Sequence, residues 1–132
     1  MIKEDNNKMF KRGDVWLVDL GEVTMKSGSR QMGKRPVVIA GNNMGNTYAK
    51  ILSVIPISSA STKLRKLLPT HVQLTPENSK IERDSVVMAE QTVVISKDQV
   101  IEKLFELDNE LMTKIDIAIA IQFGLLNLAR AM

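Results

Sequence analysis

The chain has 132 residues, a hydrophobic fraction of 44% and a net charge of +3, which is typical of one globular domain with its own core. It contains no cysteine and one histidine, which excludes a disulfide framework, a thiolate metal site and a paired-histidine mechanism within one chain. Apolar runs are too short to cross a membrane and residues 1–12 lack the core of a signal peptide, so we expect a cytoplasmic protein without a membrane segment.

Positive charge is concentrated in one stretch. Residues 23–76 contain eight lysines and arginines and no acidic residue, so the remaining residues carry a net negative charge. A charge split of this kind indicates a surface for a polyanion, with the rest of the protein left for solubility and other contacts.

The predicted elements begin with a flexible arm over residues 1–10, and one domain is expected over 11–132. Residues 12–14 and 41–46 have turn chemistry, and the segments 21–35 and 58–69 are polar enough for long loops. Strands are predicted from runs of β-branched and apolar residues at 15–20, 36–40, 49–57, 70–74 and 85–95, the last of them broken near Glu90 and Gln91.

Helical signals are confined to the end of the chain. Ser96 resembles the cap of a helix start, and Asp108 is predicted to cap the last helix. On that helix, Ile115, Ile119 and Phe123 are candidates for a dimer surface, with packing inside the same chain as the alternative. Several short strands followed by a helix predict a mainly β fold, a small β-barrel with a terminal helix.

A glycine-bracketed basic loop precedes the second predicted strand. Gly28 and Gly33 let the backbone approach a ligand closely, and Arg30 and Arg35 have the chemistry to hold a phosphate. Pro36 favours an extended conformation at Arg35, which would keep that side chain at the rim of the sheet. A solvated basic hairpin loop is the alternative interpretation.

A pair of hydroxyls follows the third predicted strand. Ser58 and Ser59 can donate to phosphate oxygens there, or bond the local backbone instead. Lys63, Arg65 and Lys66 form a candidate phosphate track, with an ordinary solvated loop as the alternative. The chain has one tryptophan, one tyrosine and three phenylalanines, so extensive stacking on bases is not expected.

Two titratable residues stand out in the predicted strands. His71 has the near-neutral pKa range that suits acid–base catalysis of RNA cleavage, although a lone histidine in an alternating strand is more typical of a structural role. Glu90 either faces a groove or ends its strand in solvent. Other acidic residues show no metal-binding spacing, so neither a metal nor another cofactor is expected.

Taken together, four blocks of sequence resemble the MazF/PemK family of toxin endoribonucleases, in particular its Gram-positive branch. Their order and spacing agree with the family over residues 11 to about 125. The blocks are RGDVW at 12–16, GSRQMGKRPVV at 28–38, IPISS at 55–59 with LPTHV at 68–72, and ERDSV at 82–86 with the pair EQ at 90–91.

The resemblance implies an SH3-like barrel that forms a homodimer, cleaves single-stranded RNA such as mRNA at specific sequences without a metal, and is neutralised by a MazE-like antitoxin with a disordered acidic tail. The family's catalytic arginine falls on Arg35, and its catalytic hydroxyl, more often threonine, falls on Ser58. Arg30 stands where the family often has glutamate, a departure that bears on RNA recognition. The candidate RNA-binding positions are Arg30, Gln31, Gly33, Ser59, Lys63, Arg65, Lys66, Glu90 and Gln91.

The mechanism we expect is attack by the RNA 2′-OH on the adjacent phosphate, which gives a 2′,3′-cyclic phosphate and a 5′-OH end. Arg35 would stabilise the charge on the phosphorane, and Ser58 would orient a phosphate oxygen or the 2′-OH. The general base is left open between Glu90 and water. Two other functions stay open as well, a CcdB-like DNA gyrase poison and a non-catalytic nucleic-acid-binding barrel.

Overall fold

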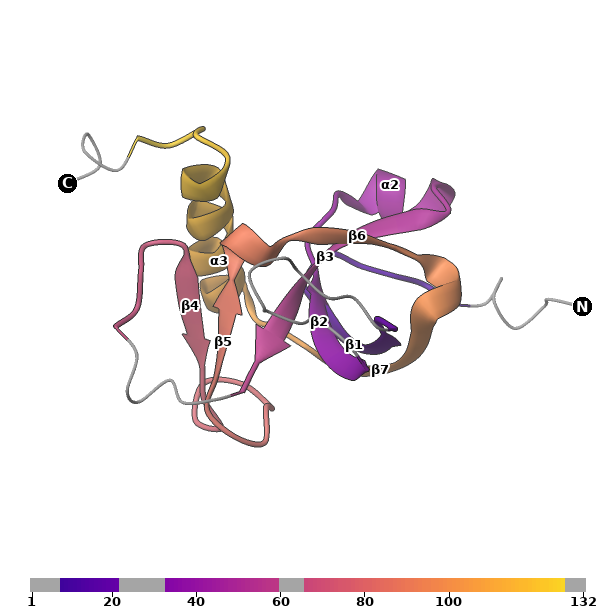
Figure 1. Cartoon of the computed structure of the whole chain (residues 1–132), viewed down its shortest axis with the longest axis horizontal. Helices are drawn as coiled ribbons and strands as arrows, with labels where there is room; N and C mark the ends of the chain where they lie inside the picture. The colour runs from indigo at the N-terminus through magenta and orange to yellow at the C-terminus, as the bar shows by residue number, and fades with distance from the viewer. Residues whose placement is uncertain (1–7, 22–32, 60–65, 128–132) are drawn as a thin grey trace, which may run out of the picture.

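The structure, a computed structural model, describes residues 8–21, 33–59 and 66–127 (Figure 1). Within these ranges, seven antiparallel strands form a bent sheet with a C-terminal helix beside it, in agreement with the predicted fold class. The elements are β1 Asp14–Asp19, β2 Lys34–Ile39, α2 Asn43–Tyr48, β3 Ile51–Ser58, β4 His71–Leu74, β5 Ser85–Met88, the 3-10 turn η2 Ala89–Gln91, β6 Val93–Ser96, the 3-10 turn η3 Lys97–Gln99, β7 Val100–Glu106 and α3 Asn109–Gln122.

β3 is the strand where the sheet divides. The strand order is β4-β5-β3-β2-β1-β7, with β6 also paired to β3, so the sheet is barrel-like but not closed. One edge of β3 pairs with β6 from Ile51 to Val54 and with β5 at Ile57 and Ser58. Pro56 lies between these two registers and near the strand end, where its missing N–H costs no ladder bond on that edge.

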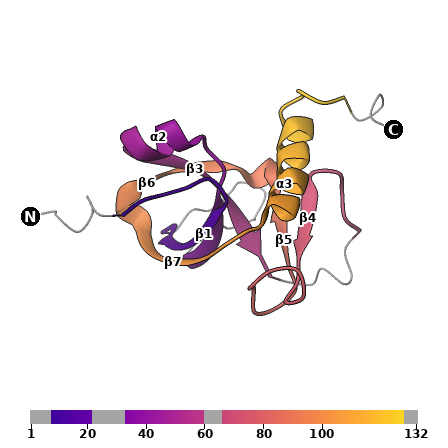
Figure 2. The same ribbon diagram turned by 180° about the vertical axis from the view of Figure 1, so that it is seen from behind.

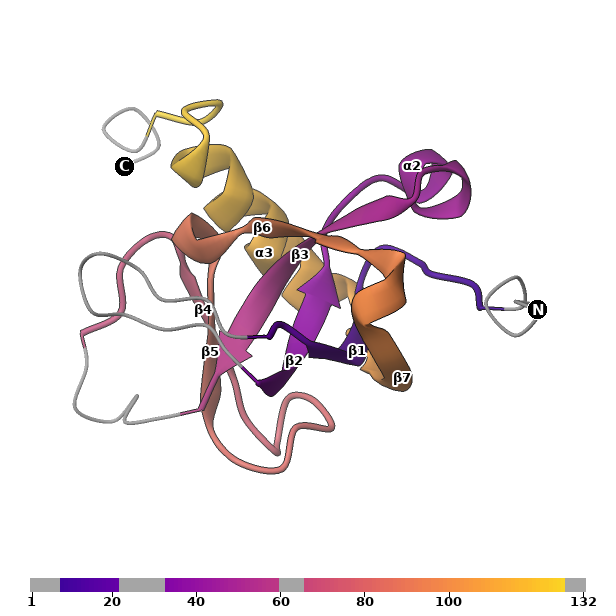
Figure 3. The same cartoon turned by 45° about the vertical axis from the view of Figure 1, so that its right-hand side comes forward.

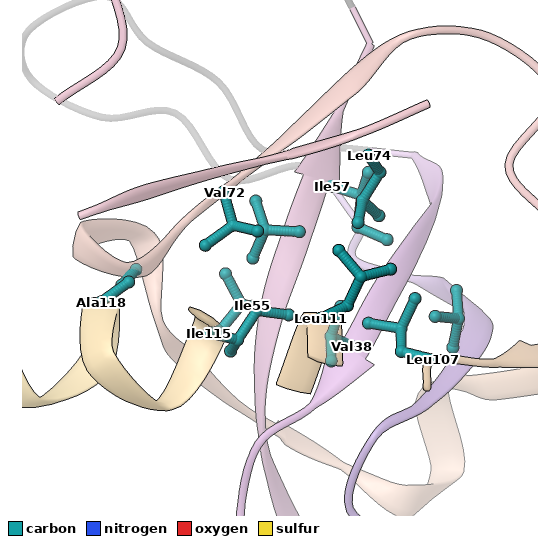
Figure 4. Packing of buried hydrophobic residues seen from close by; sticks show 12 residues of the cluster. Val38, Ile55, Ile57, Val72, Leu74, Leu107, Leu111, Ile115 and Ala118 are labelled. Carbon is teal, nitrogen blue, oxygen red and sulfur yellow. The ribbon is translucent and has the colours of Figure 1, made fainter. Parts of the chain in front are cut away.

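The sheet separates two apolar clusters because successive side chains of a strand point to opposite faces. One cluster includes Val38 and Ile55 and packs against Leu111 and Ile115 of α3 (Figure 4). The other lies on the opposite face and includes Trp16, whose ring centroid is 4.7 Å from that of Phe10, together with Val18, Val37, Ile39, Leu52 and Val54. Membership of a cluster therefore identifies the face to which each strand position points.

The predicted last helix is confirmed. The Asp108 side chain caps it by accepting a hydrogen bond from the Leu111 N–H at 2.9 Å, and α3 packs against β4 and η2 (Figure 2). Ile115 is fully buried in this chain's own core, so its apolar side chain is explained by packing within the chain and not by a dimer surface. Phe123, in contrast, is 59% exposed. None of the helices in the described ranges is long and apolar enough to span a bilayer.

The prediction of a turn at 41–46 is wrong for residues 43–46, because they belong to the short helix α2, which lies away from α3 (Figure 3). Asn42 caps α2, since its Oδ1 accepts from the Gly45 N–H at 2.7 Å. The buried Asn46 donates from Nδ2 to the Gly41 carbonyl at 2.9 Å. The asparagines and glycines that indicated a turn thus serve as cap and internal bonds of a helix.

The helix start predicted at Ser96 is limited to one 3-10 turn. Ser96 Oγ accepts from the Asp98 N–H at 3.2 Å, and Gln99 Oε1 accepts from the Ser96 N–H at 2.8 Å, which completes a capping box. The chain then enters β7, a strand that the sequence did not predict. β7 pairs only with β1 in the strand order and is mostly exposed, so it lacks the alternating apolar pattern that reveals a strand.

Candidate functional site

The predicted site residues divide into those that the structure describes and those that it does not. Arg30, Gln31, Lys63 and Arg65 lie outside the described residues and stay predictions. Of the others, Ser59, Lys66 and Glu90 are exposed, and Arg35, Ser58 and Gln91 are half-buried. The domain boundaries also stay predictions; Phe10, at the end of the expected arm, is buried against Trp16.

Arg35 and Ser58 lie at neighbouring ends of β2 and β3. The paired positions of these strands end with Val37 opposite Pro56, and Arg35 and Ser58 lie two residues beyond that pair on their strands. Side chains two residues apart on a strand point to the same face, so Arg35 and Ser58 share the face of the Val37–Pro56 pair. The sheet therefore brings the two predicted catalytic residues to one end and one face, and their catalytic role stays a prediction.

This pair belongs to a row of residues that runs across four strands. Ser58 pairs with Val86 of β5, and Val86 pairs with Gln73 of β4. Their sequence neighbours Ile57, Val87, Val72 and Leu74 all belong to the cluster under α3, so the row points to the face opposite α3. Gln73 is exposed on that face; nothing in its local sequence had marked it.

Gly33 holds the start of β2 in place. Its N–H donates to the Gly21 carbonyl at 2.8 Å, and its carbonyl accepts from the Leu20 N–H at 2.9 Å. Its φ is +75°, a conformation that favours glycine. These two bonds fix the direction in which the backbone enters Lys34 and Arg35, the first residues of β2.

A groove of about 620 Å³ lies where β2 ends its pairing and β5 begins. Its cationic lining residues are Lys34, Arg35, Lys80 and Arg83, and Glu82 is the acidic one. Ser59, and not Ser58, is among its described lining residues. The apolar part is formed by Pro36, Ile57, Ile81, Leu104 and Phe105. Four positive groups around an apolar floor suit an anion that carries an apolar or aromatic part.

Lys80 and Arg83 were not predicted as site residues. Both are exposed and lie beyond the acid-free stretch, in a part of the chain whose net charge is negative. They reach the groove because the segment before β5 folds back beside the end of β3, which is a consequence of the β3–β5 pairing. The run ERDS had been noted only for its family resemblance.

Glu90 accepts two side-chain hydrogen bonds instead of ending its strand free in solvent. Its Oε1 accepts from Thr70 Oγ1 at 2.7 Å, and its Oε2 lies 2.8 Å from His71 Nε2. Burial raises the pKa of Glu90, but the bonds from His71 and Thr70 outweigh it and hold the pKa below its ordinary value. Glu90 is therefore ionised at neutral pH, with a hydrogen-bond partner on each carboxylate oxygen.

His71 fits the structural role. Its side chain is 3% exposed, and its Nδ1 accepts from the Leu68 N–H at 3.1 Å while Nε2 faces Glu90. Within the part of the chain that the structure describes, no three histidine, cysteine or acidic side chains come together in a way that could hold a metal ion.

Comparison with known proteins gives the family of the chain. The sequence model of a family described as PemK-like, MazF-like toxin of type II toxin-antitoxin system matches residues 11–123. The protein named Endoribonuclease EndoA from Bacillus subtilis (strain 168) is 38% identical over 119 residues, which cover 90% of this chain and 98% of that protein.

Solved structures agree with this relationship. An endoribonuclease from a mycobacterial species, in complex with its cognate antitoxin, superposes with a TM-score of 0.71 at 26% identity and covers 89% of this chain and 97% of its own. MazF (Form-I) from Deinococcus radiodurans has a TM-score of 0.71 at 16% identity, with 89% and 99% covered. The latter likeness supports the small-barrel fold alone.

Proposed function

Because the chain belongs to the PemK-like, MazF-like toxins of type II toxin-antitoxin systems, we propose that it is an endoribonuclease toxin that cleaves single-stranded RNA at specific sequences. The observation that carries the proposal to this chain's own residues is the placement of Arg35 and Ser58 at neighbouring ends of β2 and β3 and on one face, beyond the Val37–Pro56 pair. An arginine and a hydroxyl on one face form a site for a phosphodiester, and Arg35 also lines the cationic groove.

The reaction is an in-line transfer within the RNA. The 2′-oxygen forms a bond to the adjacent phosphorus, the bond from phosphorus to the 5′-oxygen breaks, and the proton of the 2′-OH leaves while the 5′-oxygen gains one. The products are a 2′,3′-cyclic phosphate and a 5′-OH end. Arg35 stabilises the charge that develops on the phosphorane, and Ser58 orients a phosphate oxygen or the 2′-OH. Arginine is too basic to accept the proton, and the general base is left open between Glu90 and water.

The cationic groove supplies affinity for the RNA backbone. Lys34, Lys80 and Arg83 lie around it together with Arg35, and contacts of lysine and arginine with phosphates are sequence-independent and weaken with salt. The same charge would attract the acidic tail of a cognate MazE-like antitoxin. We further propose that the toxin acts as a homodimer in the cytoplasm; the mycobacterial neighbour and a Deinococcus radiodurans neighbour were both solved as complexes of toxin with antitoxin.

The test is cleavage of a long single-stranded RNA by the purified protein in the presence of EDTA, with the new 5′ ends mapped. The wild type is expected to cut at a recurring short motif. Arg35→Ala is expected to lower the rate by about 10²–10³, the usual cost of losing one group that stabilises the transition-state charge. Arg35→Lys keeps the charge but loses the bidentate geometry, so its rate is expected to lie between the two.

Lys114→Ala is the matched control, since it removes one positive charge from an exposed position of α3. It is expected to cut like the wild type. Intact RNA with folded wild-type protein would overturn the proposed function, and inhibition of DNA gyrase would then be the next assay. Full activity of a folded Arg35→Ala protein would remove Arg35 from the mechanism.

A further inference from the structure

The cationic groove and the side chains of Arg35 and Ser58 lie on opposite faces of one end of the sheet. Ile57 lines the groove and belongs to the cluster under α3, whereas the next side chain, that of Ser58, points to the other face. Ile81 and Phe105 line the groove as well, and both pack against the same cluster. The groove is therefore on the α3 side of the sheet, and the predicted reaction centre is on the other side.

The groove nevertheless begins directly beside the predicted reaction centre. Ser59 lines it, and consecutive Cα atoms are about 3.8 Å apart, so its backbone adjoins that of Ser58. On β2, Arg35 lines the groove together with its neighbours Lys34 and Pro36. An RNA strand whose scissile phosphate lies at Ser58 therefore reaches the groove with the nucleotide next to the cut, by passing over the end of the sheet.

Three cations of the groove are available to an anion. Lys34, Lys80 and Arg83 are exposed lining residues. Within the described ranges, none of the three has an acidic side chain as its ion-pair partner. Their charges are therefore not neutralised inside this part of the protein, and they can bind the phosphate of a nucleotide.

A β-bulge in β7 contributes to the apolar floor of the groove. Val15 of β1 pairs with Phe105 of β7. The next residue, Trp16, pairs with Lys103, which leaves Leu104 without a partner on β1. Consecutive side chains of a regular strand point to opposite faces, but Leu104 and Phe105 both line the groove. The bulge thus re-aims Leu104, which is 42% exposed and belongs to neither core cluster.

We propose that this groove binds the base of the nucleotide next to the cut, with Leu104 and Phe105 against the base and Lys80 and Arg83 at the phosphate. This rests on the proposed function. Every base has a flat face that stacks on apolar and aromatic side chains, and such stacking tolerates all sequences. The groove therefore requires a base at this position without selecting which one.

A groove that holds only the phosphate backbone gives a different expectation. Phosphate contacts depend on charge and not on the base, so removal of either the base or the leucine would leave RNA affinity unchanged. An abasic residue in the RNA and a polar residue at position 104 therefore test the two sides of the same contact.

Three substitutions on β7 define the contact. Leu104→Ser removes the apolar side chain at an exposed position, so the fold is expected to persist, and Leu104→Met keeps an apolar side chain of similar volume. Ile101→Ser is the matched control. Ile101 is the extra residue at a second bulge of β7, is 40% exposed and is not among the residues that line the groove.

The experiment begins with the cut mapped for the wild type. Affinity is then measured for an RNA oligomer of that motif with a 2′-deoxy residue at the cut, and for the same oligomer with one abasic residue at each position in turn. At one position next to the cut, the wild type is expected to lose about fivefold or more, the lower end of what stacking of one base contributes. Replacement of that base by each of the other three is expected to cost less than its removal.

Leu104→Ser is expected to bind the intact oligomer more weakly by the same factor and to lose nothing further when that one base is removed. Leu104→Met and Ile101→Ser are expected to keep the wild-type pattern. Adenosine 5′-monophosphate at high concentration is expected to displace the oligomer from the wild type, because both occupy the groove.

The contrary results are distinct. An abasic scan of the wild type without a loss next to the cut overturns this inference without any variant, and so does a folded Leu104→Ser protein that keeps the wild-type loss at every position. Equal effects of Ile101→Ser and Leu104→Ser would attribute them to distortion of β7, and binding of the monophosphate without displacement would make the groove a separate site; either overturns the inference. In all these cases RNA cleavage by the wild type leaves the proposed function standing, whereas intact RNA overturns both.

Discussion

Arg12 Nη2 lies 2.7 Å from Asp116 Oδ1, so the turn that leads into β1 is joined to α3. The same guanidinium donates from Nε to the Ala40 carbonyl at 2.9 Å, and the Arg12 backbone N–H donates to Asn43 Oδ1 at 2.7 Å. An arginine at the start of the RGDVW block therefore connects the N-terminal turn, the end of β2 and the last helix. These contacts within the protein explain an arginine at position 12 without a role in RNA binding.

Arg12→Ala is expected to destabilise the protein more than Asp116→Ala. The ion pair is partly exposed, and exposed pairs contribute about 0–1 kcal/mol, so loss of Asp116 alone has a small effect. Loss of Arg12 removes the bond to the Ala40 carbonyl as well, which adds about 1 kcal/mol. Urea unfolding of the two variants measures the difference. Equal losses would show that the ion pair, and not the bond to Ala40, carries the effect.

Gly13→Ala is expected to cost more stability than Gly124→Ala. Both glycines have positive φ, +94° and +76°, where an alanine is strained by about 1–2 kcal/mol. In Gly13→Ala the new Cβ would also lie 3.3 Å from Met112 Cγ, whereas in Gly124→Ala no atom lies within 4 Å of the new Cβ. Comparison of the two melting temperatures isolates the contact with α3. Similar losses would mean that the flexible Met112 moves aside without cost.

Glu90 makes the stability of the folded protein depend on pH in the acid range. Its pKa is lower in the folded protein than its ordinary value of 4.5, so it stabilises the fold above that pH, and the stabilisation is lost as the pH falls through the folded pKa. The melting temperature of wild type minus that of Glu90→Gln is therefore expected to be largest near neutral pH and to shrink below pH 4.5.

Thr70→Val tests the cause of this loss of stability at acid pH. Valine keeps the shape of threonine but removes one of the hydroxyl bonds that lower the pKa of Glu90. In this variant the contribution of Glu90 to stability is expected to be lost at a higher pH than in the wild type. A difference between wild type and Glu90→Gln that stays constant with pH would contradict the assignment of these bonds to the ionised carboxylate.

The fold could be predicted wherever the sequence pattern is local. The segment 15–20 and the alternating segment 70–74 lie on β1 and β4, and Asp108 caps α3 as expected. α2 and β7 were missed for physical reasons. In α2 the asparagines that indicate a turn form a cap and buried bonds, and β7 is an exposed edge strand that pairing with β1 holds in place.

The site was predictable in part for the same reason. Arg35 and Ser58 each stand at the end of a predicted strand, and the pairing of those strands brings these ends to the same edge of the sheet. The bonds from Thr70 and His71 to Glu90 join residues about 20 positions apart, and no local pattern reports such a contact. Lys80 and Arg83 reach the groove through the fold of the segment before β5, so their part also required the structure.

Lys80 and Arg83 allow the last test, because they line the groove but lie outside the acid-free stretch of residues 23–76. If the groove holds RNA, removal of both charges weakens binding at low salt and flattens its salt dependence. Each phosphate contact on a single strand contributes about 0.7 to the slope of log affinity against log salt. The double variant Lys80→Ala and Arg83→Ala is therefore expected to lower that slope by about 1.4, measured on an RNA oligomer with 2′-deoxy substitutions that prevent cleavage.

The control is the double variant Lys50→Ala and Lys114→Ala, which removes the same charge elsewhere. Lys50 belongs to the acid-free stretch but precedes β3, at the end of that strand far from Ser58, and Lys114 lies on the exposed side of α3. Its slope is expected to match the wild type because neither lysine lines the groove. If the slope fell by the same amount in both double variants, the RNA affinity would depend on the net charge of the protein and not on the positions of these charges.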